Sequence, residues 1–264
     1  MDHREAGKYW QANADAWTRL ARAGYDVYRD HLNTPAFLEL LPPIAERRGL
    51  DLGCGEGHNT RQLALRGARV TGLDIAEKFI THARAEENRS PLGIDYVCAS
   101  AVELPFADAS FDFATAFMAL MDIPDAKAVL RESYRVLRPG GFLQFSISHP
   151  CFDTPHRNNR RTLLGRTRAI EVGDYFEGHK PRVEEWIFGA APQALKTQLP
   201  PFRIPVFHRT LTAWTKLLLD AGFVIEALNE PRPDDETVRR VPALQDAQVV
   251  AYFLHIRVRK PERI

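Results

Sequence analysis

The sequence has few cysteines and no long apolar run, and each absence excludes a class of protein. The three cysteines, Cys54, Cys98 and Cys151, form no C-x-x-C pair, so neither a disulfide framework nor a cysteine zinc site is expected. No stretch approaches the roughly 18 apolar residues of a membrane-spanning helix. The first ten residues, MDHREAGKYW, contain no apolar signal core. We therefore expect a cytoplasmic protein with no membrane partner.

The sequence also lacks an excess of charge of either sign. Its 35 lysines and arginines nearly balance its 34 aspartates and glutamates. This balance provides no general attraction to nucleic acid or to a membrane surface. Histidine and acidic residues form no compact group at the spacing of metal ligands, so no metal is expected. With 264 residues, 45% of them apolar, the chain is long enough for one large domain with a sizeable core.

Residues 48–149 alternate between short apolar runs and amphipathic helical segments. Runs such as GLDL at 49–52 and FDFATAFM at 111–118 indicate buried strands. Strands that alternate with helices predict βαβ units around a largely parallel sheet. Residues 8–41 are typical of two or three helical pieces. Residues 209–264 predict a helix and two strands that pair antiparallel at the sheet edge.

Residues 150–208 break this pattern. They are rich in proline, arginine, glycine and aromatic residues, and their periodicity is weak. A structureless loop of this length is unusual inside a compact domain, so we expect an inserted lid. The chain is accordingly predicted to be a single domain with a helical N-terminal cover at 1–45, a core at 46–149, a lid at 150–208, and a C-terminal helix and strands at 209–264.

The stretch LDLGCGEGHNT at 50–60 places three glycines directly after the first core strand. Glycine allows sharp bends and the close approach of a ligand to the backbone. In an open parallel sheet, ligands bind at the carboxyl ends of the strands, where this loop lies. The dinucleotide fingerprint G-x-G-x-x-G does not fit, because His58 or Thr60 occupies the place of its third glycine. The phosphate-binding P-loop pattern is also absent.

Four segments together resemble the class I S-adenosylmethionine-dependent methyltransferases, and the nearest match is their ubiquinone-biosynthesis-type, small-molecule branch. The segments are LDLGCGEG at 50–57, GLDI at 72–75, ELPFADASFDFATAFM at 103–118 and RVLRPGGFLQFSI at 135–147. The resemblance covers 48–149 strongly and 209–260 more loosely. It implies an α/β, Rossmann-like three-layer sandwich. The expected sheet is seven-stranded and mostly parallel, with an antiparallel C-terminal edge strand.

The resemblance also implies a cofactor, S-adenosyl-L-methionine, which is converted to S-adenosyl-L-homocysteine. Asp74 is expected to hold the ribose hydroxyls, and Asp51 to hydrogen-bond toward the amino group of the methionine part. Arg29, in the N-terminal cover, is a candidate partner for the cofactor carboxylate. In the alternative interpretation, both aspartates merely satisfy loop amides. The other expected cofactor residues are Tyr28, Gly53, Cys54, Gly55, Asn59, Ile75, Ser100, Ala101, Phe117 and Met118.

Three further residues are candidates for acid–base chemistry on the methyl acceptor. His149 lies just beyond the fifth strand, His208 begins the helix after the lid, and Tyr175 is a lid aromatic. A histidine at the crevice could act as a general base near neutral pH. Each residue also has a structural alternative, as a turn histidine, a histidine that braces a helix, and a packing tyrosine.

The predicted function is methyl transfer to a small organic acceptor. Methyltransferases that act on exocyclic base nitrogens carry an Asp/Asn-Pro-Pro-Tyr element where this chain reads FMALMD, which disfavours a base as the acceptor. Five arginines between 157 and 168 are the best signal for nucleic acid, but an acidic stretch follows them. The alternatives are an NAD(P)-dependent oxidoreductase, a non-catalytic S-adenosylmethionine-binding protein and a nucleic-acid methyltransferase. The acceptor, the atom methylated and the oligomeric state stay open.

Overall fold

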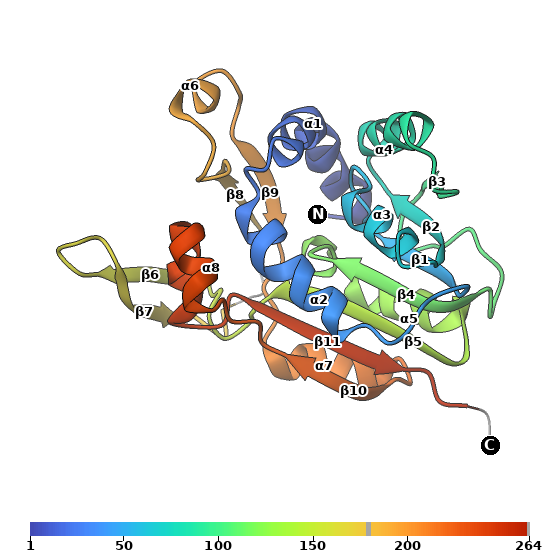
Figure 1. The fold of residues 1–264 in the computed structure, drawn as a ribbon. Helices are drawn as coiled ribbons and strands as arrows, with labels where there is room; N and C mark the ends of the chain where they lie inside the picture. Colours follow the sequence, from blue (N-terminus) through green and yellow to red (C-terminus); the bar gives the residue numbers. More distant parts are fainter. Residues whose placement is uncertain (178–180, 263–264) are drawn as a thin grey trace.

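A seven-stranded sheet forms the centre of the protein (Figure 1). The structure is a computed structural model, and it describes residues 1–177 and 181–262. The strand order is β10-β11-β5-β4-β1-β2-β3, and β1 to β5 run parallel to one another. β11 runs antiparallel between β5 and β10, one position in from the edge. The bounds are β1 (Arg48–Leu52), β2 (Arg69–Asp74), β3 (Asp95–Cys98), β4 (Phe111–Phe117), β5 (Leu137–Ser148), β10 (Val224–Asn229) and β11 (Phe253–Arg259).

Helices cover both faces of this sheet and complete three layers (Figure 1). On one face, Phe37 and Leu63 pack with Phe113 of β4, and on the other face Trp214 and Leu218 pack among apolar residues of β5 and β11. The expected Rossmann-like sandwich is confirmed. The first face carries α2 (Thr34–Leu40), α3 (His58–Ala64) and α4 (Glu77–Arg89), and the second α5 (Ala126–Val136) and α7 (Leu211–Asp220).

The central strands place the candidate site, because their carboxyl ends lie side by side. β1 is buried along nearly its whole length, as a strand with helices on both faces must be. Its register pairs Asp51 with Gly72 on β2 and with Thr115 on β4. The glycine loop after β1 therefore meets Asp74 at the end of β2 and Phe117 at the end of β4.

The N-terminal segment folds as expected into consecutive helical pieces, α1 (His3–Arg22), the π-helix η1 (Arg29–Asn33) and α2. Trp10 and Trp17 lie on one face of α1, with ring centroids 5.5 Å apart. α1 lies against α4 on one side and β9 on the other (Figure 1). None of the described helices is both long enough and apolar enough to cross a membrane.

Residues 150–208 contain two antiparallel hairpins that the weak sequence periodicity did not predict. β6 (His156–Arg161) pairs with β7 (Thr167–Gly173), and β8 (Arg182–Trp186) pairs with β9 (Phe202–Val206). β6, β7 and β8 escape prediction because their side chains are largely exposed and many are charged, as in HRNNRR of β6, whereas β9 is short and carries a proline. The remaining short elements are η2 (Leu120–Asp122), α6 (Gln193–Lys196), α8 (Asp235–Arg240) and η3 (Pro242–Gln248).

Candidate functional site

A cavity of about 670 Å³ lies at the carboxyl ends of β1, β2 and β4. The glycine loop and the segment after β4 line its floor. Residues of α1 and η1 line a second side, and β8 and β9 a third. The volume falls within the range of about 300 to 1,000 Å³ that is usual for small-molecule sites. The cavity therefore joins the predicted core, cover and lid at one place.

The glycines of the loop have different physical roles. Gly53, Gly55 and Gly57 all have positive φ, at +66°, +55° and +88°. A Cβ at Gly53 would lie 2.5 Å from the Ala119 Cβ, and one at Gly57 would lie 2.5 Å from the Tyr96 hydroxyl. At Gly55, no described atom beyond its chain neighbours lies within 4 Å of that position. Gly55 thus faces open space in the cavity, where a ligand can approach the backbone.

Asp74 ends β2 beside this loop. Its Oδ2 accepts the Gly55 N–H at 2.9 Å, and its Oδ1 accepts the Ala76 N–H at 2.8 Å. Burial raises the pKa of Asp74 to about 6. A carboxylate offers about four lone-pair sites, so Asp74 can still accept hydrogen bonds from a ligand. Loop amide and ligand hydroxyls are therefore compatible partners of the same side chain.

Asp51 is more completely enclosed. Its two oxygens accept hydrogen bonds from the hydroxyls of Thr60, at 2.7 Å, and Thr115, at 2.8 Å. Burial raises the pKa of Asp51 to about 7. These bonds tie β1 to α3 and β4, so Asp51 has a structural role in addition to lining the cavity. Neither threonine stands out in the sequence, because only the tertiary fold brings it to the aspartate.

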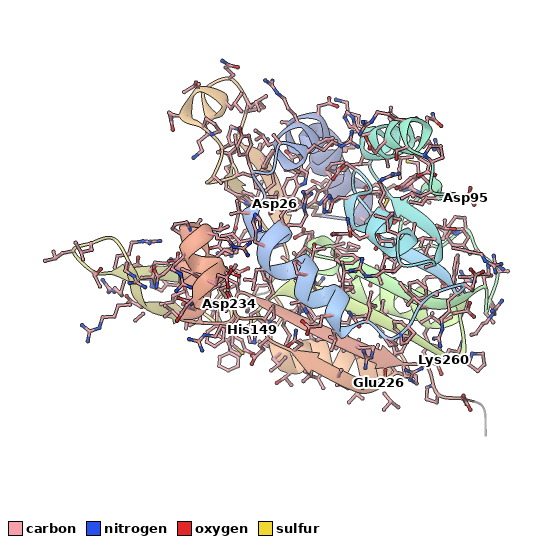
Figure 2. All side chains as sticks on the ribbon, viewed as in Figure 1. Asp26, Asp95, His149, Glu226, Asp234 and Lys260 are labelled. Carbon is pink, nitrogen blue, oxygen red and sulfur yellow. The ribbon has the colours of Figure 1, made fainter. Side chains whose placement is uncertain are left out.

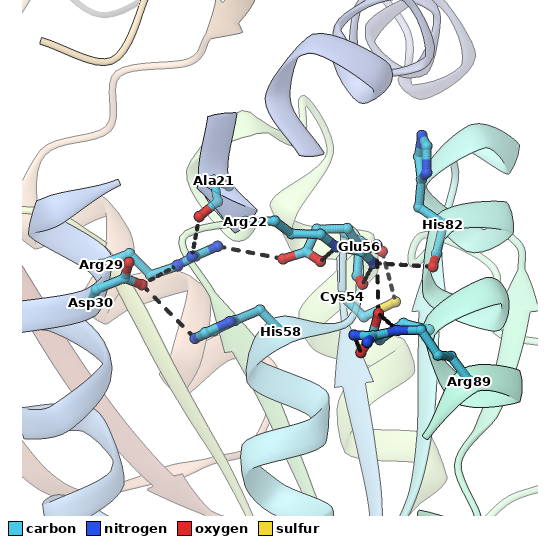
Figure 3. A network of polar contacts seen from close by, with 11 residues as sticks. Ala21, Arg22, Arg29, Asp30, Cys54, Glu56, His58, His82 and Arg89 are labelled. Carbon is cyan, nitrogen blue, oxygen red and sulfur yellow. Dashed lines mark hydrogen bonds and ion pairs between the residues drawn. The ribbon is translucent and has the colours of Figure 1, made fainter. Parts of the chain in front are cut away.

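Glu56, inside the glycine loop, is the centre of a polar network that holds the N-terminal cover in place (Figure 3). Arg22 Nε donates to its Oε2 at 2.8 Å, and Arg29 Nη1 lies 3.5 Å from its Oε1. Arg29 also donates to Asp30 at 2.7 Å and to the Ala21 carbonyl at 3.1 Å. Arg29 lines the cavity, but three of its nitrogens already have protein partners. Glu56 is not among the residues expected from the sequence, where its only signal is its place between two loop glycines.

The residues expected to bind the cofactor all line this one cavity. Met118 is notable, because φ of +51° places a non-glycine residue in a strained conformation at the cavity wall. Tyr28 stacks on Tyr252 at 5.2 Å and donates to the Ala243 carbonyl at 2.8 Å. The lining includes Tyr28, Arg29, Asp51, Gly53, Cys54, Gly55, Asn59, Asp74, Ile75, Ser100, Ala101, Phe117 and Met118.

Of the three acid–base candidates, the structure brings His208 to the cavity. Its Nε2 lies 2.9 Å from the Tyr175 carbonyl oxygen, which can only accept, so Nε2 carries the hydrogen. Its Nδ1 is then the hydrogen-bond acceptor of the ring. A proton can therefore be taken up at Nδ1 while Nε2 fixes the orientation of the ring.

His149 and Tyr175 do not line the cavity, contrary to the sequence-based expectation. His149 is buried at the end of β5 (Figure 2), where its Nε2 lies 2.7 Å from Glu230 and its Nδ1 accepts the Cys151 N–H at 3.2 Å. The Tyr175 hydroxyl accepts the Leu211 N–H at 2.8 Å at the start of α7. Both side chains use their polar atoms to hold the chain around the insert, which corresponds to their structural alternatives.

The cavity is acidic, although the whole chain is nearly neutral. Seven carboxyl side chains line it against three guanidinium groups. Burial raises the pKa of Asp26, labelled in Figure 2, to about 6. The described residues contain no group of three or more histidine, cysteine or acidic side chains arranged to hold a metal. The charged lining consists of Asp26, Asp51, Glu56, Asp74, Asp122, Asp153, Glu184, Arg29, Arg157 and Arg209.

Comparison with known proteins agrees with this geometry. Residues 50–145 match the family described as a methyltransferase domain. The ubiquinone biosynthesis O-methyltransferase of Chromobacterium violaceum is 36% identical over 150 residues, which make up 55% of this chain and 59% of that protein. The enzyme of the same name from Pseudomonas putida (strain W619) is 31% identical over 188 residues, 69% of this chain and 74% of that protein.

The chain spans about half to three quarters of the length of such curated relatives. A solved structure described as an S-adenosylmethionine-dependent methyltransferase from Mesorhizobium loti is similar over 85% of this chain and 96% of that chain. Its TM-score is 0.68 and its sequence identity is 29%. Sequence, fold and site geometry lead to one assignment. The chain belongs to the S-adenosylmethionine-dependent methyltransferase family.

Proposed function

We propose that the protein transfers a methyl group from S-adenosyl-L-methionine to a small organic acceptor in this cavity. The observation that carries the proposal is the open backbone of Gly55 beside the carboxylate of Asp74. Such a cradle suits a ligand with a ribose diol and a chain that passes close to the loop. When bound, S-adenosylmethionine supplies an electrophilic methyl group. The protein therefore has to bind the cofactor, orient the acceptor and exclude water.

In this proposal, different walls of the cavity bind different parts of the cofactor. Asp74 accepts hydrogen bonds from the ribose hydroxyls, and Ile75 lies against the adenine. The backbone of Gly53 and Gly55 passes under the methionine part. The strained Met118 lies at the end of β4, beside the reacting centre. The other residues expected to bind the cofactor complete these walls. Among them, Asp51 lies toward the amino group of the methionine part.

The charge of the cavity supports a positively charged ligand. Carboxyl groups outnumber guanidinium groups in the lining by seven to three. Burial raises the pKa of Asp26, Asp51 and Asp74, and a cationic ligand favours the ionised form of such carboxyls. The sulfonium of S-adenosylmethionine is a cation, whereas the thioether of the product is neutral.

We assign the acid–base role to His208. A protic acceptor must lose a proton when it is methylated, and a positioned imidazole near neutral pH is suited to take it. The Tyr175 carbonyl holds Nε2–H, so Nδ1 is the atom that receives the proton. His208→Gln is expected to lower the rate of methyl transfer and to leave cofactor affinity unchanged.

The cellular setting and the division of the chain belong to the same proposal. Three free cysteines suit the reducing cytoplasm. The cover at 1–45, the core at 46–149, the lid at 150–208 and the C-terminal part at 209–264 are proposed to act as one domain. The names of the relatives support a small-molecule acceptor.

Native mass spectrometry tests the proposal against its nearest rival. The intact protein is mixed separately with S-adenosylmethionine, S-adenosylhomocysteine and NADH. We expect adducts with the first two ligands and none with NADH. An NADH adduct without either of the others would favour the oxidoreductase and contradict the proposal.

A further inference from the structure

The cavity has further charged groups beyond the glycine loop and Asp74. Asp122 closes η2, which packs against β9, and Glu184 lies on β8 opposite Ile204 of β9. Asp153 and Arg157, from the start of the insert, also line this part. We call the part of the cavity lined by Asp122, Asp153, Arg157 and Glu184 the acceptor chamber. Its lining residues lie outside the motifs that the cofactor uses.

Asp122 is the unusual group in the acceptor chamber. It is 8% exposed, and its side chain has no hydrogen bond or ion pair with any described residue. Burial, followed by the charges of Asp153 and Glu184, raises its pKa well above the ordinary value. A buried carboxyl without a partner is costly, and such groups are uncommon in folded proteins. A buried carboxyl that lines a ligand cavity and has no hydrogen bond is explained if the ligand supplies its partner.

Two guanidinium groups lie near Asp122, and the charge of Arg209 acts on this carboxyl without a hydrogen bond between them. Arg209 donates to the backbone carbonyls of Ile123 and Pro124, both at 2.7 Å, and so fixes the turn after η2. Arg157 lies 4.3 Å over the ring of Tyr252, and its Nη1 is 3.7 Å from Asp153. Glu184 is paired with Arg182 at 3.0 Å, so Asp122 is the carboxyl of the chamber that has neither a hydrogen bond nor an ion pair with a described residue.

The walls around this charge are aromatic. Trp186 and Phe188, whose ring centroids are 5.7 Å apart, line the cavity from the second hairpin. Phe207 and Trp214 also line it, but the Arg209 guanidinium already lies over both of their rings, at 5.9 and 5.2 Å from the centroids. Aromatic faces attract cations, most strongly where water is excluded. A carboxylate beside aromatic rings is a recurrent arrangement for binding an organic ammonium group.

We propose that the methyl acceptor carries a basic nitrogen, bound as an ammonium cation against Asp122 and between the aromatic walls of the acceptor chamber. The nitrogen is the recognition group, whichever atom is methylated. This inference rests on the proposed function, because it assigns the remaining part of the same cavity. An anionic acceptor is the competing chemistry, since Nε and Nη2 of Arg157 are buried without a partner among the described residues. An anionic acceptor is disfavoured because its negative group would enter a chamber lined by three carboxyl groups.

Three matched probes test the inference by calorimetry. They are 2-phenylethylamine, 2-phenylethanol and phenylacetate, which share a ring and differ in charge. Each is titrated at pH 8 into the intact protein, with and without saturating S-adenosylhomocysteine. The amine is expected to bind at least about tenfold more tightly than the alcohol, with phenylacetate the weakest, because a partly buried ion pair outweighs a neutral hydrogen bond.

Asp122→Asn is expected to reduce the affinity for the amine about tenfold and to leave the affinities for 2-phenylethanol and S-adenosylhomocysteine unchanged. Its midpoint of thermal unfolding should not fall, because Asp122 has no partner to lose. Asp108→Asn, at an exposed carboxyl outside the cavity, is the control and should change none of these values. Loss of fold in Asp122→Asn would contradict the inference, because it would show a structural role.

Three results would overturn the inference. They are equal affinity for amine and alcohol, preference for phenylacetate, and no binding of any probe by protein that binds S-adenosylhomocysteine. Preference for phenylacetate would make Arg157 the anchor. Failure of the proposed function looks different. It appears as no heat from S-adenosylhomocysteine, while the preference for the amine and its dependence on Asp122 can still be measured without that ligand.

Discussion

Asp74 is a buried carboxyl beside the glycine loop. It accepts two backbone hydrogen bonds and still has free lone pairs for a ligand. Its ligand partners are proposed to be hydroxyl donors, which bind the ionised carboxylate. Protons and ligand therefore compete for the same oxygens. This competition makes ligand affinity at Asp74 dependent on pH in a predictable direction.

We expect the affinity for S-adenosylhomocysteine to fall as the pH is lowered. With the pKa of Asp74 at about 6, protonation should weaken binding about tenfold between pH 8 and pH 5. Asp51, with a pKa of about 7, adds to the loss in the same direction if the ligand requires its ionised form. Calorimetric titration at several pH values measures the effect. A flat profile would contradict the role of Asp74, and Asp74→Asn should bind weakly with less dependence on pH.

The same carboxyls affect the stability of the free protein. Their pKa values in the folded state exceed the ordinary value of 3.8, so the folded state binds more protons than the unfolded state between about pH 4 and pH 7. Their contribution to the free energy of unfolding is therefore present at low pH and is lost as the pH rises through 6 and 7. Denaturant unfolding of wild type and Asp74→Asn across this range measures it. The variant should lose less stability as the pH rises, and equal slopes would contradict the assignment.

Gly55 offers a direct test of the cradle, with Gly93 as its matched control. Both have positive φ, +55° and +76°, and both have open space where a Cβ would lie. Either substitution to alanine should cost about 1 to 2 kcal/mol of unfolding free energy through backbone strain. Only Gly55→Ala should reduce the affinity for S-adenosylhomocysteine, by at least about tenfold, since Gly93 lies outside the cavity. Equal affinities in the two variants would show that no ligand approaches Gly55.

The residues found from the sequence are those whose role depends on local chain chemistry. Glycines after a strand, and an acid at the end of the next strand, can be identified without knowledge of the tertiary fold. Glu56 and Asp122 could not be identified in this way, because their burial depends on α1 and on β9. His149 looked suitable for catalysis in the sequence, but its partner Glu230 lies 81 residues away.

Among the elements, the contact between α1 and the second hairpin closes the cavity. Trp17 packs against Phe188 and Phe202, with ring centroids 4.9 and 4.8 Å apart. It also lies at 5.5 Å from Trp186, and both tryptophans line the cavity. The cover and the lid are therefore held to each other by aromatic packing, and to the core by the ion pairs of Glu56.

Trp17→Ala should therefore loosen the cover and the lid together. We expect a loss of about 2 to 4 kcal/mol in unfolding free energy and weaker binding of S-adenosylhomocysteine. Leu218→Ala is the control, because Leu218 is fully buried on α7 and does not line the cavity. It should lose similar stability but keep its ligand affinity. Denaturant unfolding and calorimetry give the two quantities, and unchanged affinity in Trp17→Ala would separate the aromatic cluster from the site.

The elements also differ in how well the sequence predicts them. The core strands are buried on both faces, so continuous apolar runs reveal them. The first hairpin of residues 150–208 pairs two largely exposed strands, and β6 has no apolar alternation. The insert was therefore predicted as a segment, and its strands were not.

At the scale of the whole molecule, a nearly neutral chain encloses an acidic cavity. The net charge of +1 gives no indication of this, because the carboxyls come from separate parts of the chain. Folding concentrates them at one edge of the sheet, beside the loop that is open for a ligand. We expect this edge of the sheet to bind S-adenosylmethionine through Asp74.

Calorimetric titration with S-adenosylmethionine and S-adenosylhomocysteine measures this binding, with Asp74→Ala and the distant Asp108→Ala in parallel. We expect wild type and Asp108→Ala to bind both ligands. Asp74→Ala should lose at least about tenfold in affinity, because hydrogen bonds to a charged group contribute about 1.5 to 3 kcal/mol each. Absence of binding in folded wild-type protein, or unchanged affinity in folded Asp74→Ala, would contradict this expectation.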